Sequence, residues 1–121
     1  MELSPLVRPG QQIIERYGPS GFRVSGAVYR GPVLVFPDRT LVWREPAAAI
    51  ESLAPVIDDG GVEILLLGLG RRMAPVAAAL RAALKANGIA VEAMDTGAAC
   101  RTYNVLAAEE RRVAAALLPP V

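Results

Sequence analysis

Residues 62–67 read VEILLL, a nearly continuous apolar run interrupted only by Glu63. A strand with water on one face alternates apolar and polar residues, whereas an unbroken apolar run predicts a strand covered on both faces. Such coverage is typical of parallel strands that are joined by helices. This run therefore favours an α/β fold over an all-β or all-α one.

The remainder of the second half predicts helices and strands in alternation. We expect a helix opened by Pro75, a strand over residues 89–94, a helix capped by Asp95 or Thr96, and a last strand over residues 113–118. The inner side of the last helix is predicted to carry Ala99, Tyr103 and Leu106. Strand, helix, strand, helix and strand in succession imply right-handed crossovers and parallel strands.

The first half predicts short antiparallel strands. β-Branched and aromatic residues recur over residues 11–44 between closely spaced turn signals, which leaves no room for parallel crossovers. A short helix is expected from Pro46 to Pro55, where the second proline would end it, followed by a turn at the DDGG of residues 58–61.

The predicted fold is a three-layer, single α/β domain over residues 11–121. It consists of an N-terminal antiparallel β-meander joined to a C-terminal parallel β-α-β-α-β unit. Residues 1–10, which contain two prolines and a glycine, are expected to form an extended arm.

Two features of the composition limit the kinds of site and partner that can be expected. The chain has no histidine and one cysteine, Cys100, which excludes an internal disulfide, the usual zinc sites and the Ser-His and Cys-His nucleophile pairs. We therefore expect neither a metal nor a cofactor.

The charge and hydropathy of the chain bear on its partners. Thirteen basic and twelve acidic residues are too balanced for a dedicated nucleic-acid binder. No apolar stretch approaches the ~20 residues of a membrane span, so a cytoplasmic location without direct membrane insertion is expected.

Two predicted loops follow the carboxyl ends of parallel strands, where α/β sheets bind their ligands. If the loops point the same way, they form one crevice between residues 68–72 and 95–104. The residues proposed to bind a ligand or partner there are Gly68, Gly70, Arg71, Arg72, Asp95, Thr96, Arg101 and Asn104.

Each of these residues also has a structural interpretation. Gly68 and Gly70 suit an anion-binding loop, but Met73 replaces the third glycine of a dinucleotide fingerprint, so a tight strand-to-helix turn is favoured. Positive charge at a helix start is unfavourable, so Arg71 and Arg72 are expected to be offset by a bound anion or by Asp95. The alternative is that both side chains project into water.

The start of the last helix leaves similar alternatives. Cys100 beside Arg101 is in a setting that can activate a thiol, yet a buried and inert cysteine is favoured. Asn104 is expected to face either the crevice or solvent. Trp43, Tyr17 and Tyr29 suit a surface patch or the core equally well.

The chain resembles a known family over about residues 13–118. The matching segments are IIERYGPSGFRVSGAVYRGPVLVFP, the strand followed by GLG, and GIAVEAMDTGAACRTYNVLAAEERRVAAAL, of which residues 92–106 are the most specific. The family is that of the mitochondrial respiratory complex I assembly factor 3 and the adipogenesis-associated domain-containing protein. Its members often carry Gly-Thr-Gly where this chain has Leu69 between two glycines.

The resemblance implies a three-layer α/β fold and an assembly or scaffolding role, and it brings no established catalytic residue. The leading hypothesis is accordingly a non-enzymatic module that binds a partner protein, such as a component of a membrane complex. The alternative is a binding domain or enzyme for a small anionic ligand in the crevice. The sequence leaves the oligomeric state open, a homo-oligomer included.

Overall fold

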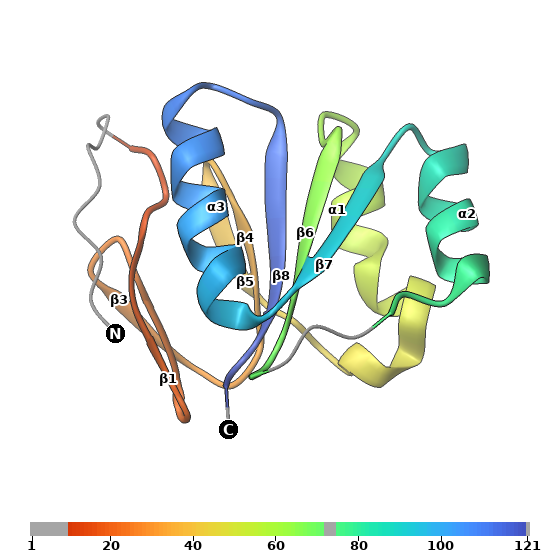
Figure 1. Cartoon of the computed structure of the whole chain (residues 1–121). Coiled ribbons are helices and arrows are strands. Elements are labelled where there is room, and N and C mark those ends of the chain that lie inside the picture. Colours follow the sequence, from red (N-terminus) through yellow and green to blue (C-terminus); the bar gives the residue numbers. More distant parts are fainter. Residues whose placement is uncertain (1–9, 72–74, 121) are drawn as a thin grey trace.

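A five-stranded sheet occupies the middle of the molecule (Figure 1). The computed structural model describes residues 10–71 and 75–120. The strands lie in the order β5-β4-β8-β6-β7, with bounds β4 (Val33–Phe36), β5 (Arg39–Val42), β6 (Ile64–Leu69), β7 (Ala90–Met94) and β8 (Val113–Leu118). β6 is parallel to β7 and to β8, which confirms the predicted C-terminal β-α-β-α-β unit.

A separate three-stranded sheet is formed by β1 (Ile14–Gly18), β2 (Gly21–Val24) and β3 (Ala27–Arg30). Every strand pair of the first half is antiparallel, as predicted. The first half nevertheless contributes to both sheets, because β4 and β5 join the central one, where β4 pairs with β8. The reason lies in β4, whose four residues are all buried, so that it needs cover on both faces.

Helices cover the central sheet on both sides. α3 (Thr96–Ala108) lies on one side with the three-stranded sheet beyond it, and η1 (Pro46–Leu53), α1 (Ala54–Asp59) and α2 (Ala78–Ala86) lie on the other (Figure 1). The α/β fold predicted from the sequence is thereby confirmed. The arm expected over residues 1–10 falls outside the described residues except for Gly10.

Two helix boundaries differ from the prediction. Pro55 does not end a helix: it lies in the first turn of α1, where a missing N–H costs nothing. The last residue of α1, Asp59, accepts a hydrogen bond from Arg39 at 2.9 Å, and the chain turns only at Gly60, with φ 76°. α2 begins at Ala78 instead of Pro75.

The inner face of α3 forms one half of the core. Ala99 and Tyr103 are fully buried and Leu106 is half-buried against the same cluster, so the predicted inner face is confirmed. Trp43 belongs to the core on the other side of the sheet, and Tyr17 and Tyr29 pack against the α3 side. These three aromatic residues therefore contribute to packing.

Cys100 is also fully buried in this cluster. Burial raises the pKa of its thiol from 9.0 to about 12, because the thiolate would lose its hydration, and the neighbouring charge of Arg101 offsets this only in part. The thiol is therefore protonated at neutral pH and has no access to solvent.

We expect Cys100 to resist thiol reagents in the folded protein. Labelling by 5,5′-dithiobis(2-nitrobenzoic acid) at pH 8 should follow the opening of the fold, because only the unfolded chain exposes the sulfur. The measurement compares labelling rates without denaturant and in 6 M guanidinium chloride, where reaction should be immediate. Rapid labelling of the native protein would contradict the packing described for α3.

Candidate functional site

The two loops predicted to form a crevice do meet at one edge of the central sheet. Gly68 is in register with Met94 of β7 and with Leu117 of β8, so the three strands end together. The backbone N–H of Thr96 donates to the carbonyl of Gly70 at 2.7 Å. We call the described residues 68–71 and 95–96 the rim. This arrangement is the one that the parallel order of the strands predicts.

Thr96 closes the rim with its hydroxyl group. Its Oγ1 accepts a hydrogen bond from the backbone N–H of Gly70 at 2.8 Å and donates one to the carbonyl of Leu118 at 2.6 Å. Thr96 is fully buried. The backbone N–H of Gly70, the donor that an anion would use, is thereby occupied by the protein itself.

The two rim glycines serve packing and turn geometry. A Cβ at Gly68 would lie 2.8 Å from Leu117 Cδ2 and 3.1 Å from Thr96 Cα, so only glycine lets the start of α3 approach β6 this closely. Gly70 has φ 91°, a conformation that other residues rarely adopt. The interpretation as a tight turn accounts for both positions.

The charged residues of the rim do not pair with each other. Asp95 caps α3, because its Oδ1 accepts a hydrogen bond from the N–H of Ala98 at 2.9 Å. Arg71 is exposed, and within the described part of the chain it forms no ion pair with Asp95. Arg72 lies outside the described residues.

Tyr17 of β1 covers the first turn of α3, a contact that the sequence analysis missed. Arg101 Nη1 donates to the Tyr17 hydroxyl at 3.3 Å. A Cβ at Gly97 would lie 2.7 Å from that hydroxyl, so the glycine makes room for the tyrosine. Gly97 directly follows the helix cap, and this small residue was the only sign in the sequence that another element packs there.

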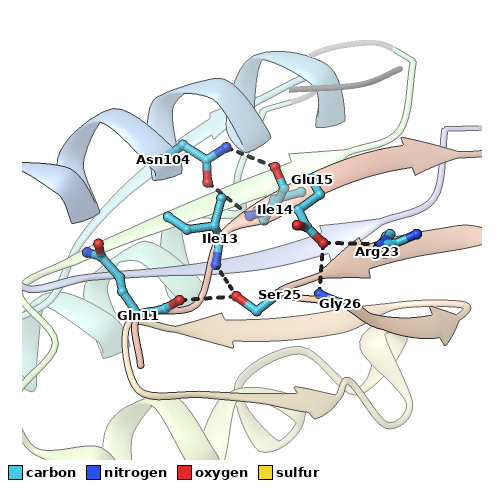
Figure 2. Close-up of polar contacts among 8 residues, drawn as sticks. All are labelled: Gln11, Ile13, Ile14, Glu15, Arg23, Ser25, Gly26 and Asn104. Carbon is cyan, nitrogen blue, oxygen red and sulfur yellow. Dashed lines mark hydrogen bonds and ion pairs between the residues drawn. The ribbon is translucent and has the colours of Figure 1, made fainter. Parts of the chain in front are cut away.

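The prediction that Asn104 faces either the crevice or solvent is wrong, because its side chain points toward Ile14 (Figure 2). Its side chain is buried, its Oδ1 accepts from the N–H of Ile14 at 3.0 Å, and its Nδ2 donates to the carbonyl of Ile14 at 2.9 Å. The amide thus occupies the place of a neighbouring strand along β1. Both its oxygen and its nitrogen are thus used to hold the three-stranded sheet against α3.

Further side chains fasten the segment that enters the three-stranded sheet. Tyr103 donates to the carbonyl of Gln12 at 3.1 Å, and Gln11 Nε2 donates to the carbonyl of Ala107 at 2.6 Å. Ser25, in the turn between β2 and β3, accepts from the N–H of Ile13 and donates to the carbonyl of Gln11 (Figure 2). The first strand is therefore held from both sides.

A hollow on the central sheet lies elsewhere, between the edge strand β5 and η1. Its volume is about 450 Å³. Its lining combines apolar side chains with three charged ones, and consists of Leu34, Leu41, Val42, Arg44, Glu45, Ala48, Glu51, Ser52 and Pro55.

Over residues 10–71 and 75–120, no three side chains suited to metal binding come together. In the same ranges no helix is both long and apolar enough to cross a membrane.

We predict that Thr96→Val lowers the free energy of unfolding by roughly 1–3 kcal/mol for each partner left without a hydrogen bond, at nearly constant side-chain volume. Urea unfolding followed by the fluorescence of Trp43, the single tryptophan, measures the change. Thr102→Val on the same helix is the matched control and should change stability little. Equal effects of the two substitutions would contradict the closed rim.

Asn104→Leu should also destabilise the protein by roughly 1–3 kcal/mol per unpaired group, since it leaves the N–H and carbonyl of Ile14 buried without partners. Asn87→Leu, at an exposed helix end, serves as the control. Hydrogen exchange measured by NMR should show the loss of protection at Ile14 first. Unchanged exchange at that amide would argue against the hydrogen bonds between Asn104 and Ile14.

Comparison with known proteins places this fold in a family. A family model described as "Protein of unknown function (DUF498/DUF598)" matches residues 14–118. An uncharacterized protein of Rhodobacter capsulatus is 43% identical over 108 residues, covering 88% of this chain and 83% of that protein. The crystal structure of a protein of Bartonella henselae, described as an outer membrane protein, has a TM-score of 0.83 at 34% identity and covers 93% of this chain and 98% of the other.

A third relative has a name that states a role. The NADH dehydrogenase (ubiquinone) 1 alpha subcomplex assembly factor 3 of Danio rerio is 39% identical over 112 residues, which cover 89% of this chain. The match spans 64% of that relative, so about a third of the fish protein has no counterpart here. With the fold, the matched range and these identities in agreement, the chain belongs to the DUF498/DUF598 family, and its relatives include a protein named as an NADH dehydrogenase assembly factor.

Proposed function

We propose that this domain is a non-enzymatic protein-binding module that assists the assembly or stability of a partner complex. The candidate partner is respiratory complex I or another membrane complex. The observation that carries the proposal is the 39% identity to a relative named as an assembly factor for NADH dehydrogenase. Because that relative is longer, the partner itself is part of the proposal.

The geometry of the rim supports a binding role over a catalytic one. A reaction site needs polar groups that are held in place and still open to a substrate. At the rim, the Thr96 hydroxyl accepts the hydrogen bond of the Gly70 N–H. Further along α3, the Asn104 amide is hydrogen-bonded to the backbone of Ile14. The Cys100 thiol is buried and protonated at neutral pH.

A cytoplasmic location is part of the same proposal. A single thiol in a fully buried position is compatible with a reducing compartment, and a cytoplasmic module can reach the exposed portions of a membrane complex. Neither a cofactor nor a nucleic acid enters the proposed role.

Deletion of the gene in the host should lower the amount of assembled complex I, and the intact chain supplied in trans should restore it. Native gel electrophoresis of detergent-solubilised membranes, with in-gel NADH oxidation, measures the assembled complex. Affinity purification of the tagged chain should recover subunits of the same complex. Unchanged levels of the complex, together with a small anion found on the purified chain by native mass spectrometry, would support the rival ligand-binding function.

A further inference from the structure

The outer face of the three-stranded sheet carries three arginines. In an antiparallel sheet, directly paired residues lie on the same face and successive residues alternate. Arg16 pairs with Arg23, which pairs with Val28, and Gly21 pairs with Arg30. Phe22 and Val24 are buried on the opposite face, so these arginines and Val28 point away from the core. We call this surface the arginine face.

The arginine face is hollowed at one end. Gly18 and Gly21 pair with each other and carry no side chains, so the backbone between the arginines is left uncovered. The hollow has a volume of about 450 Å³. Its lining is Arg16, Tyr17, Gly18, Ser20, Gly21, Phe22, Arg23, Val28, Tyr29 and Arg30. Such a space accommodates a few side chains of a partner and is too small for a folded element.

Positive charge on this face exceeds what the fold neutralises. The lining contains three guanidinium groups and no carboxylate, although the whole chain is nearly balanced at +1. Within the described residues, Glu15 pairs with Arg23 Nε at 3.2 Å, and the same oxygen accepts from the N–H of Gly26 (Figure 2). Among those residues, the side chains of Arg16 and Arg30 form no ion pair or hydrogen bond.

This excess has a cost in the isolated protein. Arg16 and Arg23 lie directly opposite each other on neighbouring strands, and like charges in that position are unfavourable. Glu15 offsets the charge of Arg23 in part, and an anion bound beside Arg16 would reduce the remaining repulsion. A guanidinium group binds a carboxylate through two parallel hydrogen bonds, so the face suits carboxylates in particular.

We propose that the arginine face docks an acidic segment of the partner protein, with aspartate or glutamate side chains placed between Arg16 and Arg30. This inference rests on the proposed function and adds the surface and the chemistry of the partner. Val28, which is 72% exposed, supplies an apolar contact beside the charges. Arginine and tyrosine are the residue types enriched at protein interfaces. Three arginines on a chain of net charge +1 are too few for tight binding along a nucleic-acid backbone.

The first test uses the full chain and two fluorescein-labelled decapeptides, one alternating glutamate with serine and one alternating glutamine with serine. Fluorescence anisotropy at 50 mM salt should show binding of the glutamate peptide only. The double substitution Arg16→Gln with Arg30→Gln should weaken that binding about tenfold or more. The pair Arg44→Gln with Lys85→Gln removes the same charge elsewhere and should leave the affinity unchanged.

Two results overturn the inference. One is equal weakening by both pairs of substitutions, which would reveal a general charge effect. The other is equal affinity for a single-stranded oligonucleotide of the same charge, which would reveal an unselective anion surface. Thermal unfolding of both double variants confirms that the exposed substitutions leave the fold intact.

The second test separates this inference from the proposed function. In the complementation experiment, the Arg16→Gln and Arg30→Gln chain should fail to restore complex I, while the Arg44→Gln and Lys85→Gln chain restores it. Full restoration by both chains overturns the arginine face as the docking surface and leaves the assembly role standing. If the intact chain has no effect either, the assembly role fails, and the peptide measurement decides the inference alone.

Discussion

The structure depends on the burial of the central sheet on both faces. β4, β6 and β8 are apolar along almost their whole length, so each face requires a covering layer. Three consecutive alanines in β8 keep the middle of the sheet thin and fully buried. One layer comes from η1, α1 and α2, and the other from α3 backed by the three-stranded sheet.

The position of the three-stranded sheet follows from that requirement. A small sheet with one apolar face is only marginally stable alone, and its first strand has a free edge. α3 covers the apolar face, because it shares a core cluster with Phe22 and Val24. It also occupies the free edge, because Asn104 hydrogen-bonds the backbone of Ile14 there. The helix that the sequence marked as a candidate reaction site is therefore the element that joins the two sheets.

This arrangement separates the buried part of the molecule from the part open to a partner. The rim has the strand order of a ligand site, but its hydrogen-bonding groups stabilise the start of α3. The outer face of the three-stranded sheet carries charge that no described group fully neutralises. The binding role proposed for this chain would use this face and not the rim. The kinship with named assembly factors agrees with this division of roles.

The sequence by itself determined the fold class and the alternation of elements, because apolar periodicity and turn residues act over a few neighbouring positions. It made the meeting of the two rim loops an expectation that depended on the direction of the strands. It also narrowed the cap of α3 to Asp95 or Thr96, between which the structure selects Asp95, and it predicted the apolar inner face of that helix. Only the tertiary structure decided what the polar side chains do. Thr96 finds its partners 26 and 22 residues away, and Asn104 finds its partner 90 residues away. Such pairings depend on which surfaces pack together, and local patterns carry no record of that choice.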